Sequence, residues 1–223
     1  MKLLLFDIDG TLIDSGGAGV RSLNLAFKKI FSIENAFKEI SMAGKTDSQI
    51  IKECLQKHGL SANGDFETVI EAYLFNLSRE INNDKKHVKP GIYEILNSLS
   101  QRENILTGLL TGNIEMGARI KLEPFKLNKF FPAGAFGSDH EDRNQLLPIA
   151  VKRFELLSGS KINIHECIVI GDTPRDVECA HIYGAISIGV ATGPYSVAEL
   201  QEAGADYVVK DFSMPFDLLK TFF

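Results

Sequence analysis

Tryptophan is absent from this chain of 223 residues, and cysteine occurs only three times. The cysteines are scattered, so their spacing matches neither a disulfide framework nor a paired metal site. The five histidines show no metal-ligand spacing either, which argues against a zinc centre. We therefore expect reduced, packed thiols of the kind found in cytoplasmic proteins. The cysteines are Cys54, Cys167 and Cys179.

Long apolar runs and basic clusters are also missing. The apolar run 3–6 stops at Asp7, so it is too short for a secretory signal, and no stretch approaches the ~18 apolar residues that cross a bilayer. The formal net charge is −5, without the Lys and Arg clusters that bind a phosphate backbone. These absences predict a cytoplasmic protein that binds neither membranes nor nucleic acid. The remaining composition, 44% apolar and 24% charged, is typical of a globular protein.

The opening stretch, MKLLLFDIDGTLID, carries the strongest local pattern of the chain. Residues 2–8 predict a short strand, whose alternation is expected to point Asp7 and Asp9 the same way. In open α/β proteins, ligands bind at the carboxyl edge of the sheet, where these two side chains would lie. Neighbouring buried carboxylates are costly unless a cation or protons offset their charge. The stretch therefore predicts a metal ion or acid–base chemistry.

The periodicity of apolar residues changes along the chain. Helical spacing covers residues 20–82 without a convincing strand. Strands then alternate with helices from about residue 88 onward, which predicts a parallel sheet. We therefore expect an α/β fold with two parts: a Rossmann-like parallel-sheet core formed by residues 1–15 and 88–223, and an inserted helical cap domain formed by residues 16–87. The predicted strands after the cap are 105–111, 133–137, 166–170, 185–190 and 206–209.

Several local features refine this organisation. The segments 15–19 and 83–89 join the two parts and are candidate hinges. Thr46 with Gln49, and Ser196 with Glu199, form capping-box patterns that predict two helix starts. Four aromatic residues of the insertion are expected in the apolar core of the cap rather than against a substrate: Phe27, Phe31, Tyr73 and Phe75.

Polar residues also end two later strands of the predicted sheet. The sequence Thr111-Gly112-Asn113 follows one strand, and Asp172, with Asp176 further on, follows another. If these strands are parallel neighbours of the first, their polar ends converge at one edge. Carboxylate and carbonyl oxygens there would suit Mg²⁺, while a hydroxyl and the N–H groups of a helix start could hold phosphoryl oxygens. One carboxylate could then attack phosphorus while a second exchanges protons.

The pattern Asp7-Ile8-Asp9-Gly10-Thr11, together with these strand ends, resembles the motifs of the haloacid dehalogenase-like (HAD) superfamily. The position and size of the helical insertion resemble its phosphoglycolate phosphatase and β-phosphoglucomutase branch. The resemblance implies that Asp7 is a nucleophile that forms an aspartyl-phosphate and also a ligand of Mg²⁺. It also implies that Asp9 is the general acid/base and that its backbone carbonyl binds Mg²⁺. The same resemblance assigns phosphate binding to Thr111, and Mg²⁺ binding to Asp172 and Asp176.

The cation of the third motif departs from the family's common Lys-Pro form, because the region is HEDRNQLLPIA. Arg143 is the best candidate, since it precedes the predicted 146–157 helix as that motif usually does, and Lys152 and Arg153 remain alternatives. Asp176 also has a structural explanation as the third residue of a helix capped by Thr173.

Lys45 has two interpretations: a solvated surface lysine, or a cap residue that reaches the substrate beside the flexible Gly44. The resemblance therefore implies a Mg²⁺-dependent phosphatase acting on a small phosphorylated metabolite. A phosphomutase of the β-phosphoglucomutase type and a non-catalytic phosphate-binding module remain open alternatives. The candidate substrate-binding residues are Thr111, Gly112, Asn113, Arg143 and Lys45.

Overall fold

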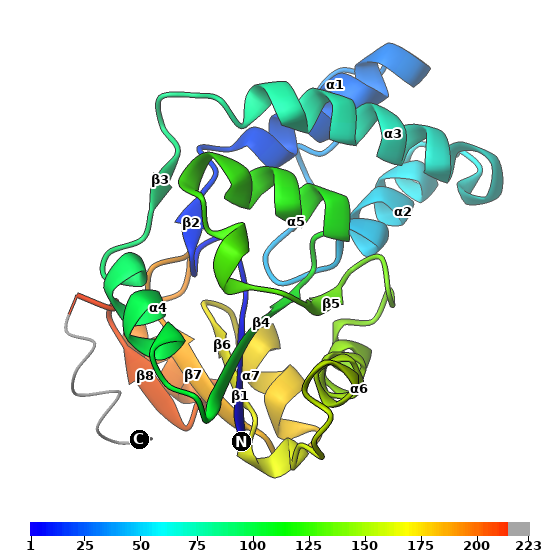
Figure 1. Ribbon diagram of the computed structural model, residues 1–223. Coiled ribbons are helices and arrows are strands. Elements are labelled where there is room, and N and C mark those ends of the chain that lie inside the picture. Colours follow the sequence, from blue (N-terminus) through cyan, green and yellow to red (C-terminus); the bar gives the residue numbers. More distant parts are fainter. Residues whose placement is uncertain (214–223) are drawn as a thin grey trace.

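The computed structural model describes residues 1–213, apart from the side chains of residues 62 and 63. Six strands in this part of the chain form one sheet in the order β5-β4-β1-β6-β7-β8, and every neighbouring pair is parallel. Strands and helices alternate after the insertion, as the sequence predicts (Figure 1). The strands are β1 (Lys2–Phe6), β4 (Ile105–Thr111), β5 (Gly134–Phe136), β6 (Ile168–Gly171), β7 (Ile186–Val190) and β8 (Tyr207–Val209).

Both faces of the sheet are covered, which explains why its strands are almost continuously apolar. In β1, Leu4 and Phe6 join the hydrophobic cluster on one face, while Leu3 and Leu5 join the cluster on the other. The first cluster contains residues of α4 and α5, and the second contains residues of α6 and α7. The bounds of these helices, and of α8 beside β7 and β8, are α4 (Ile92–Ser100), α5 (Glu115–Leu122), α6 (Leu146–Ser158), α7 (Pro174–His181) and α8 (Val197–Glu202).

Three inserted helices lie beyond the carboxyl edge of the sheet, at the top of Figure 1. They have a hydrophobic cluster of their own, which includes Phe27 and Tyr73 and also takes in Ile114 from the segment before α5. Helix α5 therefore packs against the inserted helices as well as the sheet. The inserted helices are α1 (Ala18–Phe31), α2 (Asp47–Lys57) and α3 (Ala62–Glu80).

The expectation that all four aromatics are buried in this cluster is wrong for Phe75, which is 52% exposed. Tyr73 and Leu77 lie four residues apart on the buried face of α3, so Phe75, midway between them, points the other way. The Arg79 guanidinium lies over its ring at 4.1 Å from the centroid. Phe31 is only partly buried.

A two-stranded antiparallel sheet joins the two chain segments that lead into and out of the insertion. Strand β2 (Ile13–Asp14) pairs with β3 (His87–Val88), and the Lys89 ammonium lies 3.5 Å from the Asp14 carboxylate. The sequence predicts only linkers here, because strands of two residues are too short to display a period of two. The proposed division into a core and a cap domain at residues 15 and 88 stays a prediction.

Other local predictions agree closely with the structure. Strand β4 has the predicted bounds, and the capping boxes at Thr46 and Ser196 are both formed. The first predicted strand ends two residues early, at Phe6. The three cysteines are buried and free.

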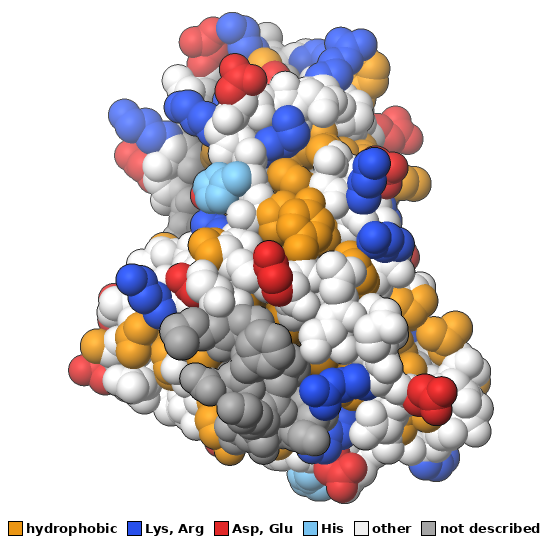
Figure 2. Space-filling model, turned by 60° about the vertical axis from the view of Figure 1, so that its left-hand side comes forward, with side chains coloured by type: hydrophobic (Ala, Val, Ile, Leu, Met, Phe, Trp, Pro, Cys, Tyr) orange, Lys and Arg blue, Asp and Glu red, His pale blue; other side chains and the backbone are white. Residues whose placement is uncertain are grey.

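The face in Figure 2 carries Lys and Arg side chains interspersed with Asp and Glu. Among the described residues, no helix has both the length and the apolar character needed to cross a membrane.

Candidate active site

The carboxyl ends of three neighbouring strands bring the predicted polar residues together. Asp7 follows β1, Thr111 ends β4, and Asp172 follows β6, so the parallel topology places all three at one edge. They line a cavity of about 470 Å³ that reaches to the inserted helices. All three side chains are buried. The predicted convergence of strand ends is therefore present, at the place where open parallel sheets bind ligands.

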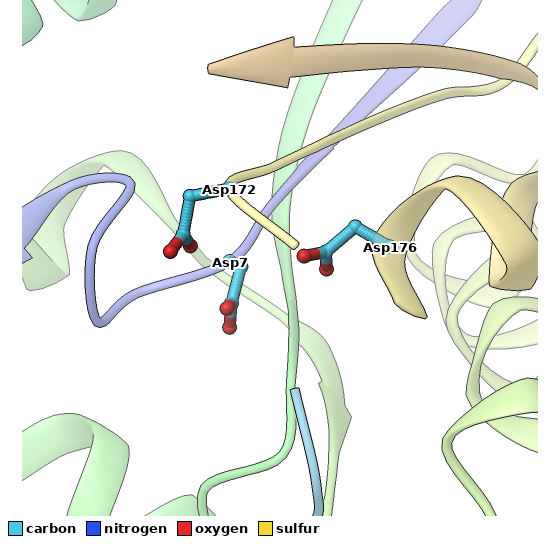
Figure 3. A group of neighbouring side chains, drawn as sticks. All are labelled: Asp7, Asp172 and Asp176. Atoms are coloured by element: carbon cyan, nitrogen blue, oxygen red, sulfur yellow. The ribbon is translucent and has the colours of Figure 1, made fainter. Parts of the chain in front are cut away.

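Three carboxylates form a compact cluster, and two of them, Asp7 and Asp172, line this cavity. Asp7, Asp172 and Asp176 each offer an oxygen, and these atoms lie within 4.8 Å of one another (Figure 3). Burial and the neighbouring Asp176 raise the pKa of Asp7 to about 6, although the Arg143 guanidinium opposes this. Burial, together with Asp7 and Asp176, also raises the pKa of Asp172 well above its ordinary value. Such a concentration of negative charge favours binding of a cation.

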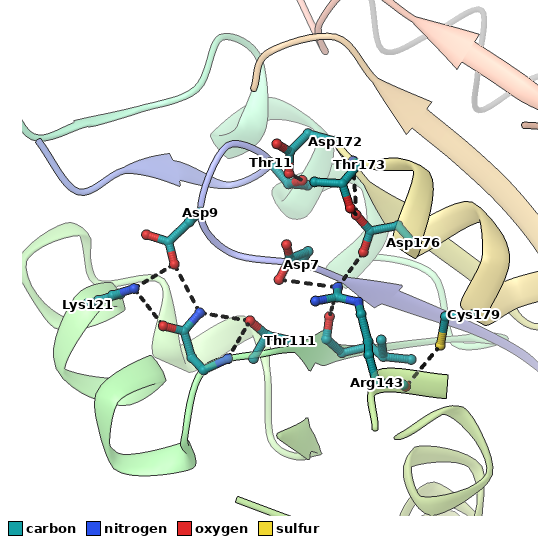
Figure 4. A network of polar contacts seen from close by, with 12 residues as sticks. Asp7, Asp9, Thr11, Thr111, Lys121, Arg143, Asp172, Thr173, Asp176 and Cys179 are labelled. Carbon is teal, nitrogen blue, oxygen red and sulfur yellow. Dashed lines mark hydrogen bonds and ion pairs between the residues drawn. The ribbon is translucent and has the colours of Figure 1, made fainter. Parts of the chain in front are cut away.

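Arg143 is the cation that the structure brings to this cluster. Its guanidinium forms an ion pair with Asp176 and lies 3.6 Å from Asp7 Oδ1 (Figure 4). Its Nε atom is buried without a hydrogen-bond partner among the described residues. The alternatives lie elsewhere, because Lys152 is exposed and Arg153 forms an ion pair with Asp139. Of the three candidates, Arg143 is therefore the one that contacts Asp7 and Asp176, and its assignment as the third-motif cation stays a prediction.

Asp176 combines the two interpretations that the sequence left open. Thr173 and Asp176 form a capping box at the start of α7, in which the Thr173 amide donates to Asp176 Oδ2 at 3.0 Å. The other carboxylate oxygen of Asp176 faces Arg143. One side chain therefore both stabilises the helix start and contributes to the acidic cluster.

Asp9 does not join this cluster. Because the strand ends at Phe6, alternation does not extend to Asp9, and its carboxylate turns toward α5 instead. Its Oδ2 atom accepts from Lys121 Nζ at 2.6 Å and from Asn113 Nδ2 at 3.0 Å (Figure 4). Burial alone would raise the pKa of Asp9, but the Lys121 ammonium and hydrogen bonds from Lys121 and Asn113 hold it below its ordinary value.

Sequence reasoning missed Lys121. It lies on the buried face of α5 with Gly117 and Ala118, a position that normally takes an apolar residue. That departure from the helical pattern is the signal that could have found it. Its ammonium also donates to Asn113 Oδ1 at 2.6 Å, so Lys121 joins Asp9 to the polar turn after β4.

Sequence reasoning also missed Asp47, the first residue of α2. Its amide donates to the Gly112 carbonyl at 2.7 Å, and its carboxylate accepts from the Ile114 amide at 3.0 Å. The helix-start amide of Ile114 is therefore already occupied by Asp47. Gly112 is required at this point, because a Cβ atom there would clash with the Lys45 carbonyl. The inserted helices thus rest directly on the turn that follows Thr111.

Lys45 lines the same cavity from the loop before α2. Its ammonium forms an ion pair with Glu53, and 18% of its side chain is exposed. It is therefore neither a fully solvated lysine nor a buried one. Its charge is available at the cavity wall if a ligand competes with Glu53.

The acidic cluster provides the hard oxygen ligands that Mg²⁺ prefers. The three carboxylates of Asp7, Asp172 and Asp176 can carry three negative charges, whereas Arg143 supplies one positive charge. The donor set and its unbalanced charge therefore fit a divalent cation. No other group of three or more acidic, His or Cys side chains of this kind occurs among residues 1–213.

Comparison with known proteins shows which proteins this chain resembles in sequence and in fold. A phosphoglycolate phosphatase from Agrobacterium fabrum is 26% identical over 213 residues, which are 95% of this chain and 89% of that protein. A Clostridium perfringens protein provisionally named pyrophosphatase PpaX is 25% identical, over 94% of this chain and 92% of that protein.

The crystal structure of a hydrolase from Pseudomonas syringae superposes with a TM-score of 0.72. The two chains are 25% identical, and the match covers 99% of each. Residues 4–190, most of the chain, match the sequence profile of the haloacid dehalogenase-like hydrolases. The chain therefore belongs to the haloacid dehalogenase-like hydrolase family.

Proposed function

We propose that this hydrolase is a Mg²⁺-dependent phosphatase that cleaves a small phosphomonoester through an aspartyl-phosphate on Asp7. One observation carries the proposal: Asp7, Asp172 and Arg143 line a single cavity, and the Asp176 carboxylate lies beside them. Thr111 lines the same cavity. This combination offers a nucleophile, a site for a cation and donors for phosphoryl oxygens.

Mg²⁺ would be held by Asp7, Asp172 and Asp176, with the backbone carbonyl of Asp9 as a further ligand implied by the family resemblance. When bound, the cation supplies positive charge that reduces the repulsion between a carboxylate and a phosphate. The pKa of Asp7 is raised because its carboxylate is buried and Arg143 compensates only part of its charge. A bound cation would supply the compensation that is missing.

In the first half of the reaction, an Asp7 oxygen attacks phosphorus and the bond from phosphorus to the leaving oxygen breaks. The Arg143 guanidinium, 3.6 Å from Asp7 Oδ1, orients the nucleophile and faces the phosphoryl group. The Thr111 hydroxyl lies at the cavity wall and can donate to a phosphoryl oxygen, whereas the side-chain amide of Asn113 already donates to Asp9 and Thr111.

Proton transfer is assigned to Asp9, whose carboxylate lines the cavity apart from the acidic cluster. The low pKa of Asp9 keeps it ionised before substrate binds. A substrate that enters as a phosphate monoanion brings the proton, which Asp9 passes to the leaving oxygen. In the second half, the ionised Asp9 accepts a proton from the water that attacks the aspartyl-phosphate, and free phosphate leaves.

The substrate is expected to be a small phosphorylated metabolite, such as phosphoglycolate or a sugar phosphate. The cavity of about 470 Å³ limits its size, and Lys45 supplies a cation near the inserted helices. The names of the relatives, phosphoglycolate phosphatase and PpaX, support a small phosphate compound. We further propose that the inserted helices act as a cap that excludes bulk water.

The test measures phosphate release from phosphoglycolate, a hexose phosphate, pyrophosphate and p-nitrophenyl phosphate, with Mg²⁺ or with EDTA. We expect metal-dependent release that is lost in Asp7→Asn. A phosphoryl group on the peptide that contains Asp7, detected by mass spectrometry after acid quenching, would identify the intermediate. If the folded, Mg²⁺-loaded protein releases phosphate from none of these compounds, the proposal that it is a phosphatase is refuted.

The two alternatives have distinct outcomes in this assay. Conversion of a hexose phosphate into its isomer without phosphate release would indicate a phosphomutase. Phosphate binding without any turnover would indicate a binding module.

A further inference from the structure

We propose that Lys121 is a positioning residue for this reaction: it holds the Asp9 carboxylate at the cavity wall and keeps it out of the metal-binding cluster. The inference rests on the proposed function, because it concerns how Asp9 is made available for proton transfer. It assigns a purpose to a buried lysine that neither the metal site nor the phosphoryl site requires.

Burial of an ammonium group is costly unless other interactions offset the cost. The Lys121 side chain is 6% exposed, and removing an ammonium from water costs several kcal/mol before its partners are counted. An apolar side chain at this position would complete the buried face of α5 without that cost. Departures from local patterning of this kind are concentrated at functional sites.

The contacts of Lys121 converge on Asp9. The ammonium donates to Asp9 Oδ2 and to Asn113 Oδ1, both at 2.6 Å, while Asn113 Nδ2 donates back to Asp9 Oδ2. These three side chains form a closed triangle of hydrogen bonds. Because the Asn113 amide also donates to the Thr111 hydroxyl at 2.8 Å, the triangle is anchored to the end of β4.

Without Lys121, the Asp9 side chain, which is 39% exposed, would lose its ion pair and keep only hydrogen bonds from the uncharged Asn113 and Ser15. Asp9 is only two residues from Asp7, so its carboxylate could turn toward a cation bound to the acidic cluster. A carboxylate that ligates the metal cannot transfer protons to the leaving oxygen. Lys121 therefore separates two neighbouring acids into a metal-binding and a proton-transferring role.

The surroundings of Lys121 are arranged to accept its charge. Asp9, Asp47 and Asp7 are the anionic groups that interact with it electrostatically. Gly19 of α1 lies beside the ammonium, because a Cβ atom there would make van der Waals contact with Lys121 Nζ at 3.4 Å. Since Asp47 and Gly19 belong to the inserted helices, Lys121 lies where these helices meet the turn that follows Thr111.

The kinetic test compares Lys121→Met with wild type on two substrates. An alkyl phosphate releases a poor leaving group that needs a proton, whereas p-nitrophenyl phosphate releases a good one. We expect kcat to fall about 100-fold for the alkyl phosphate and less than about threefold for p-nitrophenyl phosphate, since misplacing a catalytic group has effects of that order. KM should change little, and Lys121→Arg should recover part of the loss.

Arg153→Met is the matched control, because it also removes the cation of an ion pair but contacts Asp139 rather than Asp9. It should leave the ratio of the two rates unchanged. In an Asp9→Asn background, Lys121→Met should have no further effect on kcat, because Lys121 acts through Asp9. Lys121 would have a merely structural role if Lys121→Met lowered kcat equally for the alkyl phosphate and for p-nitrophenyl phosphate. The same conclusion would follow if it lowered kcat equally in the wild-type and Asp9→Asn proteins.

A second measurement does not depend on turnover. Calorimetric titration should find that Lys121→Met binds Mg²⁺ on the order of tenfold more tightly than wild type, because Asp9 becomes free to add a ligand. Asp9→Asn should abolish this gain. If wild type binds Mg²⁺ but releases no phosphate, the proposed function fails while this comparison still tests the positioning role. Equal Mg²⁺ affinities in wild type and Lys121→Met would overturn it.

Discussion

Protons and Mg²⁺ should compete for the acidic cluster, and the competition should appear in the stability of the protein. Burial and Asp176 raise the pKa of Asp7 from its ordinary value of 3.8 to about 6. Between these two pH values the folded protein binds more protons at Asp7 than the unfolded chain does. Without metal, stability is therefore lost as the pH rises through this interval, and it stays lower above it.

The size of this loss follows from the two pKa values. The difference between 3.8 and about 6 corresponds to about 3 kcal/mol of unfolding free energy. For a protein of this length, that is a shift in Tm of about 6–12 °C. Asp172, whose pKa is raised by burial, Asp7 and Asp176, contributes in the same direction.

Asp7→Asn removes the titration of Asp7, and with it the contribution of Asp7 to the raised pKa of Asp172, because asparagine resembles the protonated aspartate and does not titrate. The unfolding free energy of both proteins is measured in urea with EDTA, from pH 4 to pH 7.5. Circular dichroism is the suitable signal, since the chain contains no tryptophan. The variant should gain about 2 kcal/mol relative to wild type across this range, because part of the loss in wild type occurs below pH 4. Loss of the contact with Arg143 adds a constant difference, so only the pH-dependent part is assigned to Asp7.

Mg²⁺ should offset the loss of stability at high pH, because it binds the ionised carboxylates. At 100 times its dissociation constant it should stabilise wild type by about 2.7 kcal/mol at pH 7.5, and by much less at pH 5. A difference between variant and wild type that stays constant from pH 4 to pH 7.5 would refute the reasoning. So would a stabilisation by Mg²⁺ that is equal at both pH values.

Two further predictions concern the other contacts of the site. Arg143→Met should cost about 3–5 kcal/mol of stability at pH 7.5 and less at pH 5, since it leaves the buried Asp7 and Asp176 without their cation. Arg143→Lys keeps a positive charge, so it should lose less stability than Arg143→Met. Urea unfolding at both pH values measures these differences. Gly112→Ala should lower stability by about 1–3 kcal/mol and raise KM, because the new Cβ atom clashes with the Lys45 carbonyl and separates α2 from the turn. Gly64→Ala, where a Cβ atom meets nothing within 4 Å, is the control and should leave KM unchanged.

Much of this protein could be predicted from local patterns in its sequence. The bounds of β4 and the two capping boxes depend on neighbours within a few residues, so periodicity and capping chemistry predict them. The convergence of Asp7, Thr111 and Asp172 was also predictable, because parallel strands place their carboxyl ends at one edge. Arg143 was expected from its place before a helix, and the structure puts it beside Asp7.

Other features arise only when distant segments meet. The pairing of Ile13 with Val88 joins residues far apart in the chain, and each strand is too short to carry a signal of its own. Asp47 is an ordinary first residue of a helix until α2 rests on Gly112 and Ile114. Phe75 is an aromatic residue of the kind found in cores, yet it lies on the solvent-exposed face of α3.

The different surroundings of the two neighbouring aspartates show where sequence reasoning stops. The sequence by itself determined that Asp7 and Asp9 follow a buried strand and that polar residues end its neighbours. Only the tertiary structure decided that Asp7 joins Asp172 and Asp176, while Asp9 turns away to Lys121. The physical reason is range: strand and helix periods act over a few residues, whereas the partners that share a buried charge are 112 positions apart for Asp9 and Lys121.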